Sequence, residues 1–262
     1  MIDISKIDYS HLDRPEILHF LFHPRREWSQ TLENEQFEEL MVPVEKDVSV
    51  GGRFYRSGKQ SPTILFFHGN GEIVADYHDL GLVYLESGVN FIPVDYRGYG
   101  RSSGEPTITA MIRDAHVIFD FIRTWINQRG FTGPLIVMGR SLGSASALEL
   151  ASRYGDQIKA LIIESGFAHT QPLFELLGIK FEETKRGLDN LAKIEKFKKP
   201  TLIIHAEYDH IIPFSDGQDL FNACPAEEKR LLMIPGANHN DIFARGLPEY
   251  MAAIDSLVNK LK

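Results

Sequence analysis

The sequence predicts an α/β protein with a doubly wound sheet of about eight, mostly parallel strands and helices on both faces. Short apolar runs rich in Ile, Val, Leu and Phe recur along the chain, and each ends in a Gly, Asp or Glu. Helix-length segments separate these runs. Continuous apolar runs of this length are typical of strands buried on both faces, as in a parallel sheet that helices cover.

The first two strands are expected in "ELMVPVEKDVSV" and "GRFYR", joined near Gly51 and Gly52 as a hairpin. Six further strands are expected in "TILFFHG", "NFIPVDYRG", "PLIVMGR", "KALIIESG", "TLIIHAEYD" and "RLLMIPG". The spacing of apolar residues predicts helices over 76–87, 107–128, 142–154, 214–223 and 245–261. The hairpin makes the first part of the sheet antiparallel, whereas the later strands alternate with helices and are therefore expected to be parallel.

Composition narrows the class of protein. The 262 residues are 43% hydrophobic and 24% charged, as is ordinary for one large globular domain. A formal net charge of −8 argues against a nucleic-acid partner, which usually requires a basic surface. The N-terminal residues lack the apolar region of a signal peptide, and no apolar run reaches the ~18 residues of a membrane span. A cytoplasmic location without a transmembrane segment is therefore expected, and the oligomeric state is left open.

Metal and cofactor sites are not expected. The single cysteine, Cys224, can form neither an intramolecular disulfide nor a cysteine-based metal site, and we expect an inert thiol there. The histidines do not show the H-E-x-x-H spacing of a zinc site.

Residues 1–38 are the least regular part of the chain. The segment "RPEILHFLFHPRREW" could form a short amphipathic helix over the sheet edge, or a surface that meets a membrane or a partner. We expect an N-terminal arm packed on the core, because a membrane-surface helix normally carries more basic residues and a longer apolar face. Residues 39–262 would then form the main domain.

Three polar residues stand just after expected strands, where ligands bind in sheets of this kind. Ser141 follows the fifth strand, Asp209 the seventh and His239 the eighth. A serine hydroxyl becomes a useful nucleophile when a histidine takes its proton, and an acid on the other ring nitrogen fixes the histidine tautomer. The order Ser, Asp, His along the chain is one in which this triad occurs. These residues are the predicted catalytic groups.

The sequence around Ser141 fits a strained strand-to-helix turn. Gly139 and Gly143 flank the serine where a side chain would meet neighbouring backbone. Ser141 would then lie at a helix N-terminus, where free N–H groups favour negative charge. We expect the N–H of Leu142 to be one oxyanion donor, and the N–H of Asn70, in the loop after the third strand, to be the second.

Five motifs resemble the α/β-hydrolase superfamily from about residue 40 to the C-terminus: "HGNGE", "DYRGYGRSSG", "GRSLGS", "HAEYDHIIP" and "PGANHND". The resemblance implies an α/β-hydrolase fold with Ser141, Asp209 and His239 as the triad and Asn70 and Leu142 as oxyanion donors. Within the superfamily the chain is similar to serine hydrolases with a small lid, including esterases and depalmitoylating thioesterases. Serine at position 141 argues against the haloalkane dehalogenase and epoxide hydrolase branches, whose members have Asp there.

The remaining polar residues near the strand ends have expected structural roles. His68, with Gly69, is expected to orient the oxyanion loop rather than to transfer protons, and Asp95 and Arg97 to brace loops. Glu164, after the sixth strand, is an alternative triad acid. Asp241 is expected to cap a helix or lie at the surface, and Arg140 receives no role.

Residues 166–199 exceed a minimal connection and are predicted to form a short lid-like insertion. Its apolar residues would make a small wall over Ser141: Phe167, Pro172, Leu173, Phe174, Leu176 and Leu177. The predicted function is a serine hydrolase that cleaves small-molecule carboxylic esters or thioesters through an acyl-enzyme. Two alternatives remain open: a peptidase or amidase with the same triad, and a non-catalytic ligand-binding protein of this fold.

Overall fold

The computed structural model describes residues 2–28, 37–176, 178 and 187–261. The chain divides into two units, residues 1–135 and residues 136–262. The described residues contain eight strands, four in each unit. This number agrees with the sequence prediction.

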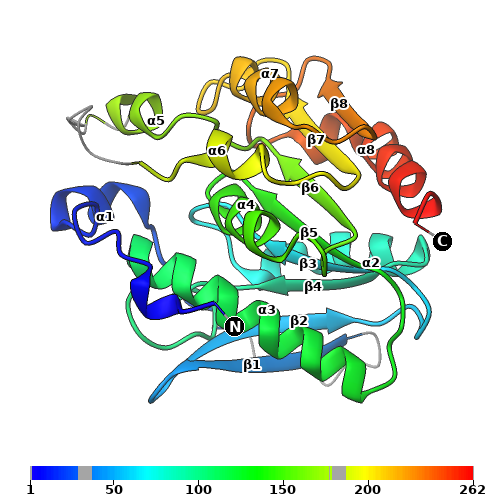
Figure 1. Cartoon of the computed structure of the whole chain (residues 1–262), viewed down its shortest axis with the longest axis horizontal. Coiled ribbons are helices and arrows are strands. Elements are labelled where there is room, and N and C mark those ends of the chain that lie inside the picture. The colour runs from blue at the N-terminus through cyan, green and yellow to red at the C-terminus, as the bar shows by residue number, and fades with distance from the viewer. Residues whose placement is uncertain (1, 29–36, 177, 179–186, 262) are drawn as a thin grey trace. The chain divides into compact units, whose positions relative to one another are not determined.

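The first unit carries four strands in the order β1-β2-β4-β3 (Figure 1). They are β1 (Phe37–Glu45), β2 (Val48–Tyr55), β3 (Thr63–Phe67) and β4 (Asn90–Val94). β2 pairs antiparallel with both β1 and β4, whereas β3 and β4 are parallel. Both β3 and β4 are buried along their whole length, as the continuous apolar runs predict.

The predicted position of the first hairpin is wrong. The turn lies at Lys46 and Asp47, and Gly51 and Gly52 are inside β2. Asp47 adopts a left-handed conformation (φ 61°), which aspartate tolerates in tight turns. The glycines serve close packing instead, since a Cβ at Gly52 would lie 3.0 Å from the Pro93 carbonyl oxygen on β4.

The helices of the first unit are η1 (Ile4–Lys6), α1 (Pro15–Leu21), η2 (Val74–Tyr77), α2 (His78–Glu86) and α3 (Ile108–Gln128). α3 matches the predicted segment 107–128, because Thr107 is its N-cap and accepts a hydrogen bond from Ala110 N–H. Asp13 of the N-terminal arm accepts two more amides of that first turn, from Ile108 and Thr109. α3 buries one apolar face and packs against β1.

The N-terminal segment buries several apolar side chains in the first unit, although Phe20 and Trp28 are exposed. Leu12, Ile17, Leu21 and Phe22 are buried, and α1 begins with Pro15, which suits a first helical position. A β-bridge joins Arg26 to Gly100 further along the segment. The boundary at residue 38 stays a prediction.

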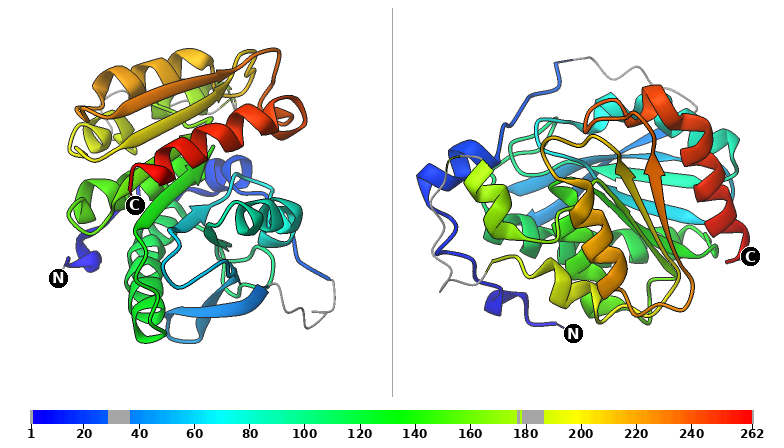
Figure 2. Two further views of the ribbon diagram at one scale, coloured as in Figure 1. Left: turned by 90° about the vertical axis from the view of Figure 1, so that its right-hand side faces the viewer. Right: turned by 90° about the horizontal axis from the view of Figure 1, so that it is seen from above.

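The second unit carries four parallel strands in the order β5-β6-β7-β8. They are β5 (Leu135–Arg140), β6 (Ala160–Glu164), β7 (Thr201–Ala206) and β8 (Lys229–Ile234). Every residue of β7 is buried, so both faces of this strand are covered. α7 (Phe214–Ala223) and α8 (Ile242–Asn259) both pack on β7 and β8, and Figure 2 shows them on opposite sides of these strands.

The other helices of the second unit are α4 (Gly143–Tyr154), α5 (Thr170–Leu176) and α6 (Asn190–Ile194). α4 and α7 agree with the predicted segments, whereas α8 begins three residues before the predicted Arg245. α8 is kinked at Gly246, whose φ of −140° is not helical, and Pro248 follows. A Cβ on Gly246 would lie 2.5 Å from Ile234 of β8, so glycine lets the kinked helix approach the strand closely.

The predicted lid-like segment 166–199 is described in part. Phe167 and Phe174 are fully buried, and α5 and α6 lie within the segment. Residues 177 and 179–186 lie outside the described residues, and so does the side chain of Leu176. The small apolar wall over Ser141 stays a prediction.

Candidate active site

Ser141 occupies a strained turn between β5 and α4. It has φ 49°, a left-handed conformation that is uncommon for a residue with a side chain. A Cβ at Gly139 would lie only 2.3 Å from the Gly143 carbonyl oxygen, which explains why glycine is needed before the serine. The N–H of Ser141 donates to the carbonyl of Glu164 at the end of β6 (2.8 Å). The turn is thus held against the neighbouring strand.

Ser141, His239 and Asp209 form one hydrogen-bonded chain. The Ser141 hydroxyl lies 3.0 Å from Nε2 of His239, and Nδ1 of His239 lies 2.7 Å from Oδ2 of Asp209. The carboxylate fixes the tautomer with a proton on Nδ1, which leaves the lone pair of Nε2 facing the serine hydroxyl. All three residues are less than 9% exposed. The arrangement has the geometry that a proton relay requires.

Asp209 is held by more than His239. Its Oδ1 accepts the N–H groups of Ile211 (3.0 Å) and Ile212 (2.8 Å). Burial favours the neutral acid, but the hydrogen bonds from His239 and from the Ile212 N–H favour the carboxylate, and the pKa of the Asp209 carboxyl lies below its ordinary value. Asp209 is therefore ionised at neutral pH.

A second buried histidine supports the loop that carries Asp209. Nε2 of His205 lies 2.8 Å from the carbonyl of Ile212 and 3.6 Å from Oδ2 of Asp209. Burial lowers the pKa of His205, so the ring is neutral and donates its Nε2 proton to the Ile212 carbonyl. Sequence reasoning missed this residue, because a histidine inside an apolar strand carries no motif.

Arg140 connects the serine turn to the loop that carries His239. Its Nη2 donates to the carbonyl oxygen of His239 (2.7 Å), and its Nε lies 3.0 Å from Oε1 of Glu164. Tyr250 of α8 donates its hydroxyl proton to Oε2 of Glu164 (2.9 Å). Arg140 and Glu164 are in register on adjacent parallel strands, and both are buried. The sequence signal for this pair is that opposite charges end two apolar runs that follow one another along the chain, but only the strand register shows that these ends are adjacent.

Glu164 is therefore the partner of Arg140 rather than the triad acid, and the alternative assignment is wrong. Nδ1 of His239 forms its hydrogen bond with Asp209. Asp241 lies beside the N-terminus of α8, but its carboxylate makes no capping hydrogen bond to the helix. It accepts the N–H of Asn238 (2.6 Å) and pairs with Arg245, so it closes the turn that contains His239.

The two expected oxyanion donors lie in different units. Leu142 directly follows Ser141 and has helical dihedrals (φ −52°, ψ −40°), so its N–H belongs to the start of α4. Amides at a helix start have no intrahelical acceptor and can receive an anion. Asn70 lies in the first unit, in the loop after β3. Its pairing with Leu142 as the second donor stays a prediction.

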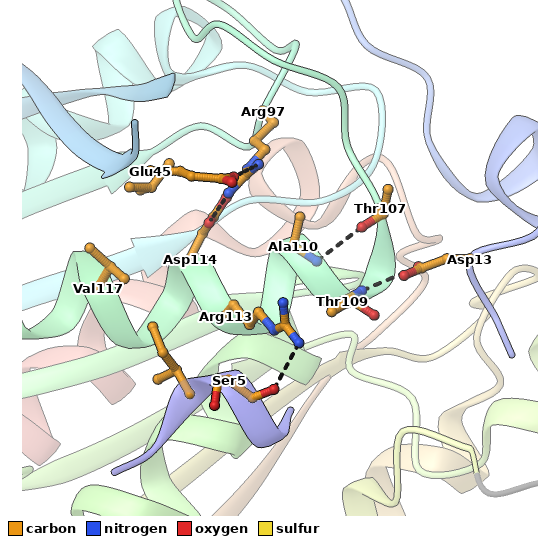
Figure 3. Close-up of a pocket in the computed structure, with 12 residues that line it drawn as sticks. Ser5, Asp13, Glu45, Arg97, Thr107, Thr109, Ala110, Arg113, Asp114 and Val117 are labelled. Carbon is orange, nitrogen blue, oxygen red and sulfur yellow. Dashed lines mark hydrogen bonds and ion pairs between the residues drawn. The ribbon is translucent and has the colours of Figure 1, made fainter. Parts of the chain in front are cut away.

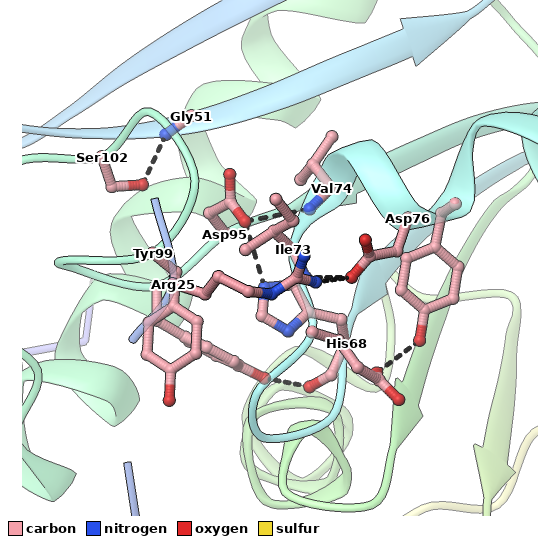
Figure 4. Close-up of polar contacts among 12 residues, drawn as sticks. Arg25, Gly51, His68, Ile73, Val74, Asp76, Asp95, Tyr99 and Ser102 are labelled. Atoms are coloured by element: carbon pink, nitrogen blue, oxygen red, sulfur yellow. Dashed lines mark hydrogen bonds and ion pairs between the residues drawn. The ribbon is translucent and has the colours of Figure 1, made fainter. Parts of the chain in front are cut away.

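His68 and Asp95 form a buried pair at the base of the Asn70 loop (Figure 4). Nε2 of His68 lies 3.2 Å from Oδ1 of Asp95, and Nδ1 lies 2.7 Å from the Gly69 carbonyl oxygen. Asp95 also accepts the N–H of Val74 (3.0 Å), and Tyr96 donates its hydroxyl proton to the carbonyl of His68. Each of these contacts restrains the backbone of the loop, and both ring nitrogens of His68 are engaged in doing so.

The first unit also contains a cavity of about 480 Å³ (Figure 3). The N-terminal arm, the end of β1 and α3 line it. Arg97 pairs there with Asp114 and Glu45 (each 2.7 Å), which braces the loop after β4 as expected. Arg113 donates to the carbonyl oxygens of Ser5 and Ile7. These charged groups are engaged with one another or with backbone.

Two features are absent from the part of the chain that the structure describes. No group of three or more His, Cys, Asp or Glu side chains is arranged to hold a metal ion among them. Within the same residues, no helix combines the length and apolar character that crossing a membrane requires. Cys224, at the end of α7, is buried.

Comparison with known proteins identifies a family model that matches this chain and several curated relatives. Residues 58–184 match the family model described as serine aminopeptidase, S33. The human protein Alpha/beta hydrolase domain-containing protein 17B is 31% identical over 249 residues, which cover 90% of this chain and 80% of that protein.

Solved structures with low sequence identity share the fold. Est1E from Butyrivibrio proteoclasticus, solved with bound ferulic acid, superposes with a TM-score of 0.72 at 18% identity, over 85% of this chain and 98% of that chain. The Pyrococcus furiosus esterase Pf2001 superposes with a TM-score of 0.73 at 15% identity, over 91% of this chain and 98% of that chain. The predicted fold, with an eight-stranded and mostly parallel sheet, is thereby confirmed.

Proposed function

Because this chain belongs to the α/β-hydrolase superfamily, with Alpha/beta hydrolase domain-containing protein 17B among its relatives, we propose that it is a serine hydrolase of carboxylic esters or thioesters. The observation that carries the proposal is the chain of hydrogen bonds from Ser141 through His239 to Asp209. A serine on a strained turn, with an oriented base at 3.0 Å, is the arrangement that nucleophilic acyl transfer needs.

In the first half of the reaction, the Ser141 oxygen attacks the acyl carbon and its proton passes to Nε2 of His239. Asp209 stabilises the imidazolium that forms while remaining ionised. The carbonyl oxygen of the substrate becomes an oxyanion, which the N–H of Leu142 and that of Asn70 would bind. Collapse of this intermediate expels the alcohol or thiol, which takes the proton from His239 and leaves Ser141 acylated.

In the second half, water takes the place of the leaving group. His239 accepts a proton from the water as it attacks the acyl carbon, and a second tetrahedral intermediate forms on the same oxyanion donors. The intermediate then releases the carboxylic acid, and the proton returns from His239 to the Ser141 oxygen. Arg140 and Asp241 would keep the imidazole in place through both halves, since they hold the backbone on either side of it.

The proposal is tested with a fluorophosphonate probe and a panel of p-nitrophenyl esters and acyl thioesters. We expect wild type to be labelled and to turn over short acyl substrates, and Ser141→Ala to do neither at equal thermal stability. A folded wild type that neither labels nor hydrolyses any member of the panel would contradict the proposal.

A peptidase or amidase is the second candidate, because the matching family model is described as a serine aminopeptidase. The triad would be the same, and the difference lies in the leaving group, an amine that must be protonated as it departs. Aminoacyl amides compared with esters of the same acyl group distinguish the two. Faster turnover of the amides at equal concentration would favour the peptidase.

A further inference from the structure

The loop that carries Asn70 is held by a part of the chain far away in sequence. We propose that residues 23–25 of the N-terminal arm position the HGN loop (residues 68–73, "HGNGEI") for oxyanion binding. This inference rests on the proposed function, since it assigns His23 and Arg25 as positioning residues for the Asn70 N–H. All of the contacts involved lie within the first unit.

Among the residues that the structure describes, the side chain of Asn70 makes three hydrogen bonds, and two of them are to the arm. Its Oδ1 accepts the backbone N–H of His23 (2.9 Å), and its Nδ2 donates to Nδ1 of His23 (2.8 Å). The hydroxyl of Tyr99 supplies the third bond, to Oδ1 (2.7 Å). The N–H of His23 also lies 2.8 Å from that hydroxyl. His23, Asn70 and Tyr99 therefore form a closed hydrogen-bonded group.

Tyr99 is a dependable donor in this group. It is fully buried, and burial raises the pKa of its hydroxyl well above the ordinary value, so it stays protonated. Its proton goes to Asn70, and its oxygen receives the His23 amide. The exposed His23 thus gains a partner on a rigid, buried side chain as well as on the loop.

Arg25 holds the other side of the HGN loop (Figure 4). Its Nε donates to the carbonyl of Gly71 (3.3 Å), and its Nη2 forms an ion pair with Asp76. The carboxylate of Asp76 in turn accepts the N–H of Ile73 (3.0 Å), the last residue of the loop. The arm therefore touches the loop at Asn70 and Gly71 and reaches its end through Asp76.

The arm can act as a fixed support because it is itself anchored next to these residues. The N–H of Gly100 donates to the carbonyl of Arg25 (2.8 Å), and Arg26 bonds to the carbonyl of Ser102. Glu27 forms a buried ion pair with Arg53 of β2 (2.6 Å). The cost of ordering the arm is thus met by contacts separate from those to the loop, and the loop gains a support that already has a defined position.

The consequence for catalysis concerns the N–H of Asn70. Oxyanion donors are effective when they are in place before charge develops, and small displacements reduce the rate strongly. His68 and Asp95 fix the base of the HGN loop, whereas the arm fixes its middle. Without the arm contacts, Asn70 would keep only the Tyr99 bond among its three side-chain hydrogen bonds.

The test uses the full chain with His23→Ala, Arg25→Ala and Asn70→Ala, the last of which removes the side-chain bonds but keeps the backbone N–H. Arg113→Ala is the matched control, because Arg113 also ties the N-terminal residues to the unit through carbonyl oxygens but does not contact the loop. Each variant is measured on an ester and on the corresponding thionoester. A C=S group is a weak acceptor, so the rate ratio between the two substrates reports how well the oxyanion donors work.

We expect each of the three variants to lower kcat for the ester roughly tenfold, because a misplaced oxyanion donor loses much of its effect. The thionoester rate should change less, so the ester-to-thionoester ratio falls, while KM and the thermal midpoint stay near those of Arg113→Ala. The double variant His23→Ala/Asn70→Ala should be no slower than Asn70→Ala alone, since Asn70→Ala already removes the bond to the His23 ring that His23→Ala removes.

Two results would overturn the inference while leaving the proposed function intact. The first is that His23→Ala, Arg25→Ala and Asn70→Ala have the same kcat as Arg113→Ala. The other is an equal loss on ester and thionoester, which would indicate a general loss of structure rather than of oxyanion binding. A wild type without ester turnover contradicts the proposed function itself, so the two failures are distinguishable.

Discussion

Asp209 is ionised and holds one tautomer of His239, so replacing its charge tests that role with little change in shape. In Asp209→Asn, the amide can donate to Nδ1 and thereby favour the tautomer whose lone pair faces away from Ser141. We expect kcat to fall by about 10⁴, as the loss of the orienting acid does in such triads. Steady-state kinetics on a p-nitrophenyl ester measures this, and a loss of less than tenfold would argue against a triad role.

The same carboxylate makes a pH-dependent contribution to stability. Its pKa is lowered in the folded chain, so its ionised form stabilises the fold at pH values above the unfolded pKa of about 3.9. This contribution is lost as pH falls through the folded value. The difference in free energy of unfolding between wild type and Asp209→Asn should therefore be largest near pH 7 and shrink below about pH 4. Urea titrations at pH 7, 5 and 3 measure it, and a difference that grows on acidification would contradict the assignment.

Arg140 is predicted to position His239 through its backbone carbonyl. Arg140→Met keeps an unbranched stem but leaves Glu164 buried without its cation, a change that typically costs about 3–5 kcal/mol. The double variant Arg140→Met/Glu164→Gln removes both charges and should recover most of that stability. Because the His239 carbonyl still lacks its donor, kcat should stay reduced by roughly tenfold with KM little changed. Recovery of both stability and kcat in the double variant would mean that Arg140 acts on stability alone.

From the sequence alone it was possible to predict the three residues that the structure joins in one hydrogen-bonded chain. A serine between glycines, and an Asp and a His after later strands, could be identified because each follows an apolar run. Arg140 received no role and Glu164 a wrong one, because the sequence does not say which strand ends are neighbours. The register that pairs β5 with β6 is what brings these two charges together.

Among the elements, the connection between β5 and α4 depends on its glycine. Gly139→Ala would place a Cβ 2.3 Å from the Gly143 carbonyl oxygen, so the backbone must move. We expect roughly 1–3 kcal/mol of destabilisation, the usual range for overpacking, together with a large loss of kcat because Ser141 moves with the turn. Thermal and urea unfolding measure the destabilisation, and ester turnover measures the loss of kcat.

Gly155→Ala is the control, since it lies at the other end of α4 with helical dihedrals and only ordinary contacts around a Cβ. Alanine there should be neutral or slightly stabilising. Equal destabilisation by the two substitutions would show that the β5–α4 turn has no special requirement for glycine.

The longer elements were predictable because packing and local pattern agree in them. α3 matches its prediction within one residue, since its apolar stripe is continuous and Thr107 is a good N-cap. The hairpin turn was predicted at Gly51 and Gly52 because glycines are common in turns, whereas it lies at Lys46 and Asp47. Gly52 instead allows the close approach of β4. The short helices α1, α5 and α6 have too few turns to show a period, so tertiary packing rather than pattern defines them.

On the scale of the whole molecule, the fold class and the strand count followed from the sequence, but the strand order did not. Alternating strands and helices predict a parallel sheet, and the motifs assign it to a superfamily. That β4 lies between β2 and β3 depends on crossover geometry, which a single sequence does not encode visibly. The contacts of residues 23–27 with loops about 50 residues or more further along were equally hidden, because exposed polar residues carry no periodic signal.

If Ser141 carries the acyl group during turnover, the acylated protein can be trapped and weighed. Wild type mixed with a p-nitrophenyl ester and quenched in acid within the first turnover should show a protein mass increased by the acyl group. Proteolysis should locate that mass on the peptide containing Ser141, and Ser141→Ala should show no adduct. An acyl adduct on another residue, or undiminished turnover by Ser141→Ala, would contradict the account.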